Sequence, residues 1–222
     1  MNTRGQASIR LILFAACGAV LAATLVACTD SASEPPPGKA VVETHGCAEC
    51  HGTFGISINP RYPNLAGQKK DYLVNQLRSF RQADSGDPKF AEMARRYFGM
   101  MNAKAKNLSD ETIDVLTTYY SSQSCSLTQR AKEPVAPKAA GTCVPCHGTD
   151  GISADSEIPN LAGQRREYIE IQLRAFRREG ERGFGKNEDS GRFHPVMTPQ
   201  AMKLQGTDIP ELAEYYSHLS CK

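Results

Sequence analysis

Cys47-Ala-Glu-Cys-His51 is a short stretch that returns 96 residues later as Cys143-Val-Pro-Cys-His147. The same interval relates Pro63-Asn-Leu-Ala-Gly-Gln68 to Pro159-Asn-Leu-Ala-Gly-Gln164. Matching residues stay 96 positions apart, with no insertion or deletion, from residue 47 to residue 125. A repeat that holds over this length predicts two copies of one unit in tandem.

We expect the two units at residues 39–127 and 137–222, separated by a linker at 128–136 that carries charges and a proline. Each unit has roughly 85–90 residues, which is small for a domain that must build a core unaided. A bound group is therefore expected to complete each core. The formal net charge of the whole chain is only +2, which gives no indication of nucleic acid as a partner.

Apolar and aromatic residues recur at the spacing of one helix face in both units. They are Tyr72, Leu73, Leu77 and Phe80 in the first unit and Tyr168, Ile169, Leu173 and Phe176 in the second. A later helix is expected to start after Ser109, which is a good N-cap residue. Its counterpart should start near Thr207, and Pro210 is compatible with it because the proline falls in the first turn.

No run of residues shows the sustained alternation of a β-strand. We therefore expect an all-α fold of two tandem domains, each with a three-helix core and long loops. The stretches 84–97 and 180–193 are interpreted as solvated loops in preference to surfaces that dock a partner.

The spacing of the cysteines and histidine points to haem. Cys47 and Cys50 lie three residues apart, so a helix places both thiols on one face, and His51 follows directly. Two thiols can attach to the vinyl groups of haem as thioethers, and the imidazole can bind the iron. The sequence thus predicts two covalently bound haem c groups with iron. The second set of residues is Cys143, Cys146 and His147.

Three other interpretations of the Cys-x-x-Cys pairs compete with haem. Structural zinc would join both pairs in one site, but it does not require a histidine after each pair. A thioredoxin-like redox pair needs a βαβ context, which the sequence lacks. A disulfide within each pair would be strained. Haem is favoured because the histidine recurs in both copies.

Met101 and Met197 are the candidates for the second axial ligand. Each lies 50 residues after the histidine of its unit, and we expect it in a loop before the last helix. His194 is a weaker rival, and Met100 is expected to pack because it aligns with Val196. Ligation by histidine and methionine raises the reduction potential and closes the iron to substrates, as in an electron carrier. A dihaem peroxidase, the enzyme alternative, would need an open iron.

The N-terminal segment predicts export. Arg4 and Arg10 precede an apolar run from Leu11 to Cys28, and no acidic residue occurs before Asp30. This pattern is typical of a signal peptide, expected at 1–27, although an uncleaved membrane anchor is the alternative. Both interpretations place the rest of the chain outside the cytoplasm.

Leu25-Val26-Ala27-Cys28 resembles a bacterial lipobox. The resemblance implies cleavage before Cys28 and lipid on its sulfur and amine, which would anchor the protein to a membrane. Residues 28–38 would then form a proline-containing lipidated tether. Thr29, where some lipoproteins have Asp, favours the outer over the inner membrane.

Two cysteines remain once the other six of the eight are assigned. Cys17 leaves with the signal peptide, Cys28 takes lipid and four bind haem. An oxidising compartment favours pairing of Cys125 with Cys221. Such a disulfide requires their Cα atoms to come within roughly 7 Å. Free thiols or an intermolecular link are the alternatives.

Residues 40–222 resemble the class I cytochromes c, specifically the tandem dihaem cytochrome c-four family. The resemblance rests on the Cys-x-x-Cys-His motifs, the Pro-Asn-Leu-Ala-Gly-Gln segments and the methionines. It implies N- and C-terminal helices packed at a right angle around each haem. It also implies that the proximal imidazoles bond to the carbonyls of Pro63 and Pro159, and such bonds tune the iron.

The function implied is single-electron transfer on the periplasmic side of a membrane. The donor would be a quinol-oxidising complex or a dehydrogenase, and the acceptor a terminal oxidase or reductase. A role as the cytochrome subunit of a dehydrogenase fits the same residues.

Overall fold

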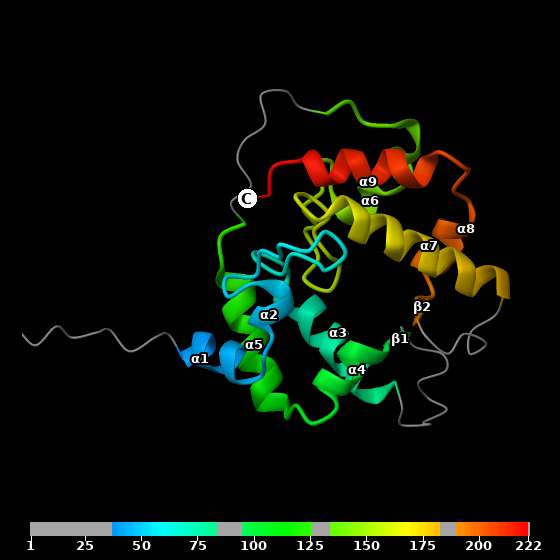
Figure 1. Cartoon of the computed structure of the whole chain (residues 1–222). Helices are drawn as coiled ribbons and strands as arrows, with labels where there is room; N and C mark the ends of the chain where they lie inside the picture. Colours follow the sequence, from blue (N-terminus) through cyan, green and yellow to red (C-terminus); the bar gives the residue numbers. More distant parts are fainter. Residues whose placement is uncertain (1–36, 84–94, 126–133, 183–189, 222) are drawn as a thin grey trace, which may run out of the picture. The chain divides into compact units, whose positions relative to one another are not determined.

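The computed structural model of the chain describes residues 37–83, 95–125, 134–182 and 190–221 (Figure 1). The expected signal peptide, Cys28 and residues 128–133 of the linker lie outside the described residues. Within the described ranges, no helix is long and apolar enough to cross a membrane.

Five helices are described in the first half of the chain. They are α1 (Pro37–Thr44), α2 (Ala48–His51), α3 (Lys70–Gln82), α4 (Gly99–Ala105) and α5 (Asp110–Ser122). The two helices expected here are present as α3 and α5. The Ser109 side chain accepts a hydrogen bond from the backbone N–H of Thr112, which confirms the predicted N-cap.

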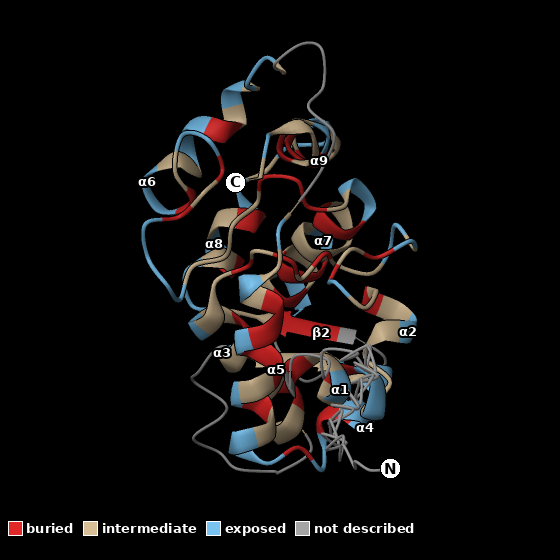
Figure 2. Ribbon diagram, turned by 90° about the vertical axis from the view of Figure 1, so that its left-hand side faces the viewer, coloured by how far each residue is buried: buried red, intermediate tan, exposed pale blue. Residues whose placement is uncertain are grey.

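The core of the first half forms where α1 packs against α5. Gly38 lies so close to Tyr119 that a Cβ atom on the glycine would be 2.5 Å from the tyrosine Cβ. The glycine therefore allows the two helices to approach closely. Val42 of α1 and Ile113 and Leu116 of α5 are almost completely buried at this contact. Figure 2 shows buried and exposed residues on different sides of α5, as expected for an amphipathic helix.

The described helices of the second half follow a similar order. They are η2, a 3-10 helix (Lys138–Thr142), α6 (Val144–His147), α7 (Arg166–Arg182), α8 (Met197–Met202) and α9 (Asp208–His218). Helix α9 begins after Thr207 with Pro210 in its first turn, as expected. Its buried side chains Leu212 and Tyr216 pack with Ala140 of η2 and Ile169 of α7.

A short antiparallel sheet joins the two halves. Strand β1 (Arg95–Phe98) pairs with β2 (Ser190–Phe193), and Arg96 lies opposite Arg192. We expected solvated loops at 84–97 and 180–193. This expectation is wrong for residues 95–97 and 190–193, which lie in the two strands. Each strand has only four residues and pairs with residues far away in the sequence. A local pattern of alternating side chains could therefore not predict the strands. Residues 84–94 and 183–189 lie outside the described part.

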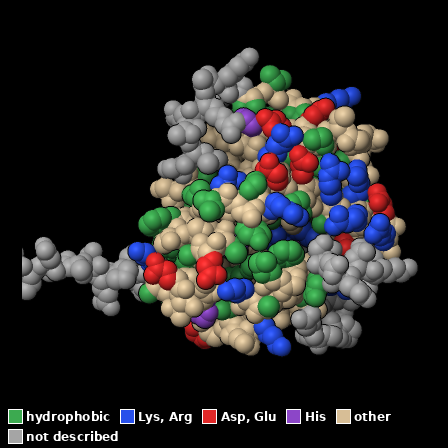
Figure 3. All heavy atoms as spheres, viewed as in Figure 1, with side chains coloured by type: hydrophobic (Ala, Val, Ile, Leu, Met, Phe, Trp, Pro, Cys, Tyr) green, Lys and Arg blue, Asp and Glu red, His purple; other side chains and the backbone are tan. Residues whose placement is uncertain are grey.

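The surface around α7 carries charges of both signs (Figure 3). Arg166 and Arg174 both form ion pairs with Glu170 within this helix, and Arg166 also pairs with Glu214 of α9. Exposed pairs of this kind contribute about 0–1 kcal/mol each to stability. This surface is mixed in charge and does not form a uniformly basic patch.

Candidate haem sites

Helix α2 brings the first cysteine–histidine motif onto a single turn. Cys47 is its N-cap residue, and the backbone N–H of His51 donates to the Cys47 carbonyl at 3.0 Å. Gly52 ends the turn with φ +76°, and a Cβ there would lie 2.3 Å from the Ile56 carbonyl oxygen. Only glycine fits this sharp exit, which sets the direction of the chain after the histidine. Gly148 repeats this geometry after His147.

His51 is buried, and a hydrogen bond orients its ring. Its Nδ1 donates to the carbonyl oxygen of Pro63 at 3.1 Å. Because a carbonyl can only accept, the proton lies on Nδ1 and the lone pair of Nε2 is left for a metal. Burial lowers the pKa of His51, the bond to Pro63 opposes this, and the charge of Arg96 lowers it further. The imidazole is therefore neutral near pH 7, as a metal ligand must be.

The second site repeats the first. His147 is 4% exposed, and its Nδ1 donates to the carbonyl oxygen of Pro159 at 2.9 Å. Burial again lowers the pKa of this histidine, with an added contribution from the charge of Arg192. The hydrogen bonds that the family resemblance implies are thus present in both halves.

The loop after each motif is fixed to the motif by a serine and an asparagine. In the first half Ser57 Oγ donates to the Cys50 carbonyl at 2.7 Å, and Asn64 Oδ1 accepts from the Ser57 backbone N–H at 3.0 Å. Ser153 and Asn160 make the same contacts in the second half. These bonds hold the proline carbonyls in place beside the imidazoles.

The methionines do not lie in the expected loop. Met101 belongs to the short helix α4 and packs against the core, while Met197 is the first residue of α8 and is partly buried. The packing role expected for Met100 is wrong, since this side chain is 47% exposed and its sulfur lies 3.9 Å from the Tyr62 hydroxyl. Val196, its aligned residue, is 51% exposed.

The His194 side chain is bonded to the backbone at the start of α8. Its Nδ1 accepts from the backbone N–H groups of Val196 and Met197 at 3.2 and 3.3 Å. The proton of the neutral ring then lies on Nε2, so neither nitrogen has a free lone pair for iron. This geometry weighs against His194 as a ligand.

The predicted disulfide between Cys125 and Cys221 is confirmed, with a Cα–Cα distance of 5.7 Å. The four motif cysteines form no disulfide, so their sulfurs remain for bonds to haem. Among the described residues, no group of three or more His, Cys, Asp or Glu is placed to hold a metal ion. The two cysteine pairs are thus not brought together as a shared zinc site would require.

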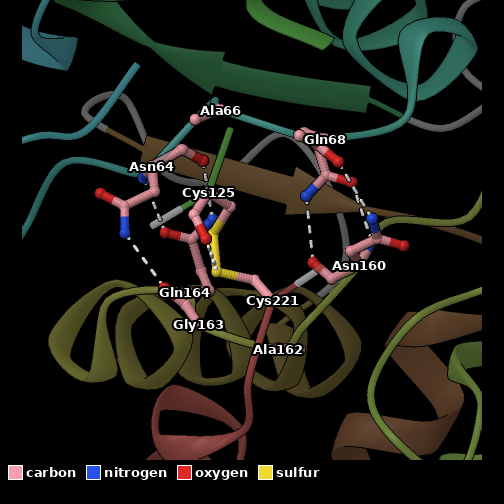
Figure 4. A pocket seen from close by; sticks show the side chains of 10 residues that line it. Asn64, Ala66, Gln68, Cys125, Asn160, Ala162, Gly163, Gln164 and Cys221 are labelled. Atoms are coloured by element: carbon pink, nitrogen blue, oxygen red, sulfur yellow. Dashed lines mark hydrogen bonds between the residues drawn. A yellow bond between two sulfur atoms is a disulfide. The ribbon is translucent and has the colours of Figure 1, made fainter. Parts of the chain in front are cut away.

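A reciprocal amide network joins the two halves beside the disulfide (Figure 4). The Gln164 side chain bonds to both the backbone N–H and the carbonyl of Asn64, at 2.7 and 2.9 Å. Gln68 bonds in the same way to Asn160, at 2.8 and 3.0 Å. Each asparagine side chain in turn donates to a backbone carbonyl of the opposite half, at Gly163 or Gly67.

The space among these side chains has a volume of only about 10 Å³, so the interface is closely packed. This role of the four amide residues was not predicted from the sequence; they are Asn64, Gln68, Asn160 and Gln164. The available signal was the repeated Pro-Asn-Leu-Ala-Gly-Gln segment, whose two amide residues keep the interval of 96. Arg96 and Arg192 keep the same interval and were also missed.

Comparison with known proteins agrees with this geometry. The cytochrome c family model matches residues 36–124 and again residues 137–220. Cytochrome c4 of Azotobacter vinelandii is 30% identical over 196 residues, covering 82% of this chain and 86% of that protein. A protein of Thiomonas intermedia (strain K12) named thiosulfate dehydrogenase electron acceptor is 32% identical over 213 residues, covering 89% of this chain and 87% of that protein.

Among solved structures, reduced recombinant cytochrome c4 from Pseudomonas stutzeri superimposes with a TM-score of 0.64 at 29% identity. The match covers 82% of this chain and 97% of that structure. The chain therefore belongs to the cytochrome c family, as a dihaem class I cytochrome c of the cytochrome c4 type.

The chain binds two covalent haem c groups and is an electron carrier. The donors present fit that cofactor: each half offers two free thiols on one helical turn and a neutral imidazole whose Nδ1 is already bonded. Haem supplies the one-electron ferric–ferrous couple.

Proposed function

We propose that each half holds its haem through the residues of its own motif. The thioether bonds would form to Cys47 and Cys50 in the first domain. His51 and Met101 would be the axial ligands of the first iron. The corresponding residues of the second domain are Cys143, Cys146, His147 and Met197.

The hydrogen bond from each imidazole to a proline carbonyl is the observation that carries this proposal. It orients the ring, places the free lone pair on Nε2 and makes the ligand more basic. Burial of both histidines excludes water from the proximal side. A methionine sulfur on the opposite side would leave no position for a substrate, which favours electron transfer over peroxidase chemistry.

The proposed site of action is the periplasmic side of a bacterial membrane. Support comes from the basic and apolar N-terminal segment, the lipobox-like Leu25–Cys28 and the disulfide, which is typical of an oxidising compartment. The mature protein would begin at Cys28 and be tethered through residues 28–38, with the outer membrane preferred. Mass spectrometry of the native protein tests this: an acylated N-terminal Cys28 is expected, and an unmodified Cys28 would contradict the anchor.

The proposed donor is a dehydrogenase or a quinol-oxidising complex, and the proposed acceptor is a terminal oxidase or reductase. The relative named thiosulfate dehydrogenase electron acceptor supports a dehydrogenase as the donor. Lys69 and Lys70 at the start of α3, and Arg165 and Arg166 at the start of α7, could dock an acidic partner. However, Lys70 pairs with Asp114 at 2.7 Å, so its charge is partly satisfied within the chain.

Mixing experiments test the role of carrier. The reduced holoprotein is mixed with membranes from the same bacterium, and its reoxidation is followed optically. Reoxidation that depends on a respiratory oxidase or reductase supports the proposal. Absence of electron transfer to any membrane fraction, together with hydrogen peroxide turnover by the isolated protein, would favour the peroxidase alternative.

A further inference from the structure

The peptide group between Pro63 and Asn64 has hydrogen-bond partners in both domains. Its carbonyl oxygen accepts from His51 Nδ1 at 3.1 Å, within the first domain. Its N–H, which is the backbone N–H of Asn64, donates to Gln164 Oε1 of the second domain at 2.7 Å. One end of this peptide group therefore contacts the expected axial ligand, and the other end contacts an amide across the domain interface.

The second domain has the reciprocal arrangement. The carbonyl oxygen of Pro159 accepts from His147 Nδ1 at 2.9 Å. The backbone N–H of Asn160 belongs to the same peptide group and donates to Gln68 Oε1 of the first domain at 2.8 Å. Figure 4 shows the side chains of both glutamines beside the asparagine of the opposite domain. Each glutamine thus contacts the peptide group that holds the histidine of the other domain.

The geometry of the peptide bond links this contact to the histidine. The bond between Pro63 and Asn64 is trans, so the group is planar and its N–H and C=O point in opposite directions. An acceptor that fixes the direction of the N–H therefore also fixes the direction of the carbonyl, which faces the imidazole of His51. Gln164 Nε2 also donates to the Asn64 carbonyl at 2.9 Å, so the amide holds this backbone at two points.

The two glutamines are themselves held in place. Gln164 is 8% exposed and Gln68 is 7% exposed. The Oε1 atom of each also accepts from the backbone N–H of the next residue at 2.9 Å, which is Arg165 in one case and Lys69 in the other. These next residues immediately precede α7 and α3. A buried amide with a fixed orientation can position the peptide group that it contacts.

Hydrogen bonds that form a chain polarise one another. A peptide N–H that donates to a good acceptor makes the carbonyl of the same group a stronger acceptor. A stronger bond from Nδ1 makes the imidazole a more basic ligand. A more basic ligand stabilises ferric iron more than ferrous iron, because ferric iron carries one positive charge more. The contact from Gln164 to the Asn64 N–H is therefore expected to lower the reduction potential of the first haem.

We propose that Gln164 positions the proximal histidine of the first haem and that Gln68 positions that of the second, each through one peptide group of the opposite domain. Both glutamines are positioning residues, since neither contacts the imidazole directly. The proposal rests on the proposed function, in which His51 and His147 bind the two irons. It makes the potential of each haem depend on a side chain of the other domain.

Redox titration of the full-length holoprotein tests this proposal, with haem methyl signals assigned to each domain by NMR. Gln164→Leu removes the amide and keeps a side chain of similar volume. The ferrous-to-ferric ratio of the first haem at fixed potential is expected to rise about threefold, which is roughly 30 mV for a one-electron couple. The second haem should be unchanged. Gln68→Leu should have the opposite selectivity.

The Nδ1–H proton signals of the two histidines in the reduced protein give an independent readout. In Gln164→Leu the signal of His51 should move upfield, because its hydrogen bond to the Pro63 carbonyl weakens, and the signal of His147 should stay in place. Gln164→Glu keeps an oxygen that can accept from the Asn64 N–H. In this variant the His51 signal should not move upfield.

A matched control separates this effect from a general weakening of the interface. The double variant Cys125→Ser/Cys221→Ser loses the covalent bond between the domains but keeps both glutamines. It should shift neither potential and neither Nδ1–H signal. If it shifts the potentials as much as Gln164→Leu does, the potentials depend on the intact interface and not on the amide contact, which would overturn the proposal.

The selectivity between the haems decides the outcome. If Gln164→Leu shifts the second haem, both haems equally or neither haem, the crossed arrangement does not set the potentials. An upfield His51 signal in Gln164→Glu would also contradict the proposal. Failure of the haem assignment itself would look different, since the unmodified protein would then lack two haem spectra. Gln68→Leu carries the test if Gln164→Leu does not yield holoprotein.

Discussion

The Cα atoms of Cys125 and Cys221 lie 5.7 Å apart, and a disulfide joins these residues across 96 positions of sequence. Cys125 follows α5 and Cys221 follows α9, so the bond ties together the chain beyond the last helix of each domain. The amide network of Asn64 and Gln164 lies beside it. Together these contacts hold the two domains against each other.

Removing this disulfide should lower stability without changing the haem sites. The double variant Cys125→Ser/Cys221→Ser is expected to lose about 2–5 kcal/mol of unfolding free energy, since the bond closes a long loop. Denaturant unfolding of the holoprotein measures this loss. The haem spectra should stay the same, and a change in ligation in the folded variant would show that the disulfide also supports a haem site.

Gln164→Ala should weaken the domain interface. The substitution leaves the backbone N–H and carbonyl of Asn64 without their partner in a buried position, which costs about 1–3 kcal/mol. Gln68→Ala should cost a similar amount because its contacts are equivalent. The exposed Gln205→Ala is the control, and an equal loss in all three variants would contradict a special role of the network.

Gly52→Ala should impair formation of the first haem site. The alanine Cβ would meet the Ile56 carbonyl oxygen at 2.3 Å, and φ is +76° at this position. Backbone strain alone costs on the order of 1–3 kcal/mol. We expect a lower yield of dihaem protein, measured by haem absorbance per protein. Gly141→Ala, where a Cβ meets no atom within 4 Å, should give the normal yield.

Met100 and Met101 are adjacent, and the repeat selects Met101 as the ligand because it aligns with Met197. Met101→Ala is expected to open the first iron and remove its methionine–iron absorption band, with a lower potential. Met100→Ala should leave both irons six-coordinate. The exposed position of Met100 near Tyr62 makes this comparison informative. If Met100→Ala removes the band while Met101→Ala keeps it, the alignment is wrong at this position.

The sequence predicted those parts of the fold that depend on local patterns or on an internal repeat. The helix beginning after Ser109 was found from its cap and apolar face, and the motifs of His51 and His147 from their spacing. The disulfide followed from the count of cysteines. Each of these features can be recognised within a short window or by aligning one half with the other.

The missed features depend on contacts between the halves. Strands β1 and β2 are four residues long and are stabilised by pairing with each other. Four residues are too few to show the alternation of side chains that is typical of a strand. The partners that Arg96 and Gln164 have in the opposite half lie 72 or more residues away along the chain. Helix α4, which carries Met101, has only seven residues and no clear apolar period, so the sequence predicts a loop there.

This electron carrier is expected to hold two haems that are both closed to substrates. A redox titration of the purified full-length protein, followed by optical spectra, tests it most directly. We predict two covalently bound haems per chain, two one-electron transitions, and six-coordinate low-spin spectra with a methionine–iron band in both. A single haem per chain, or a high-spin haem in the resting or half-reduced protein, would contradict this account.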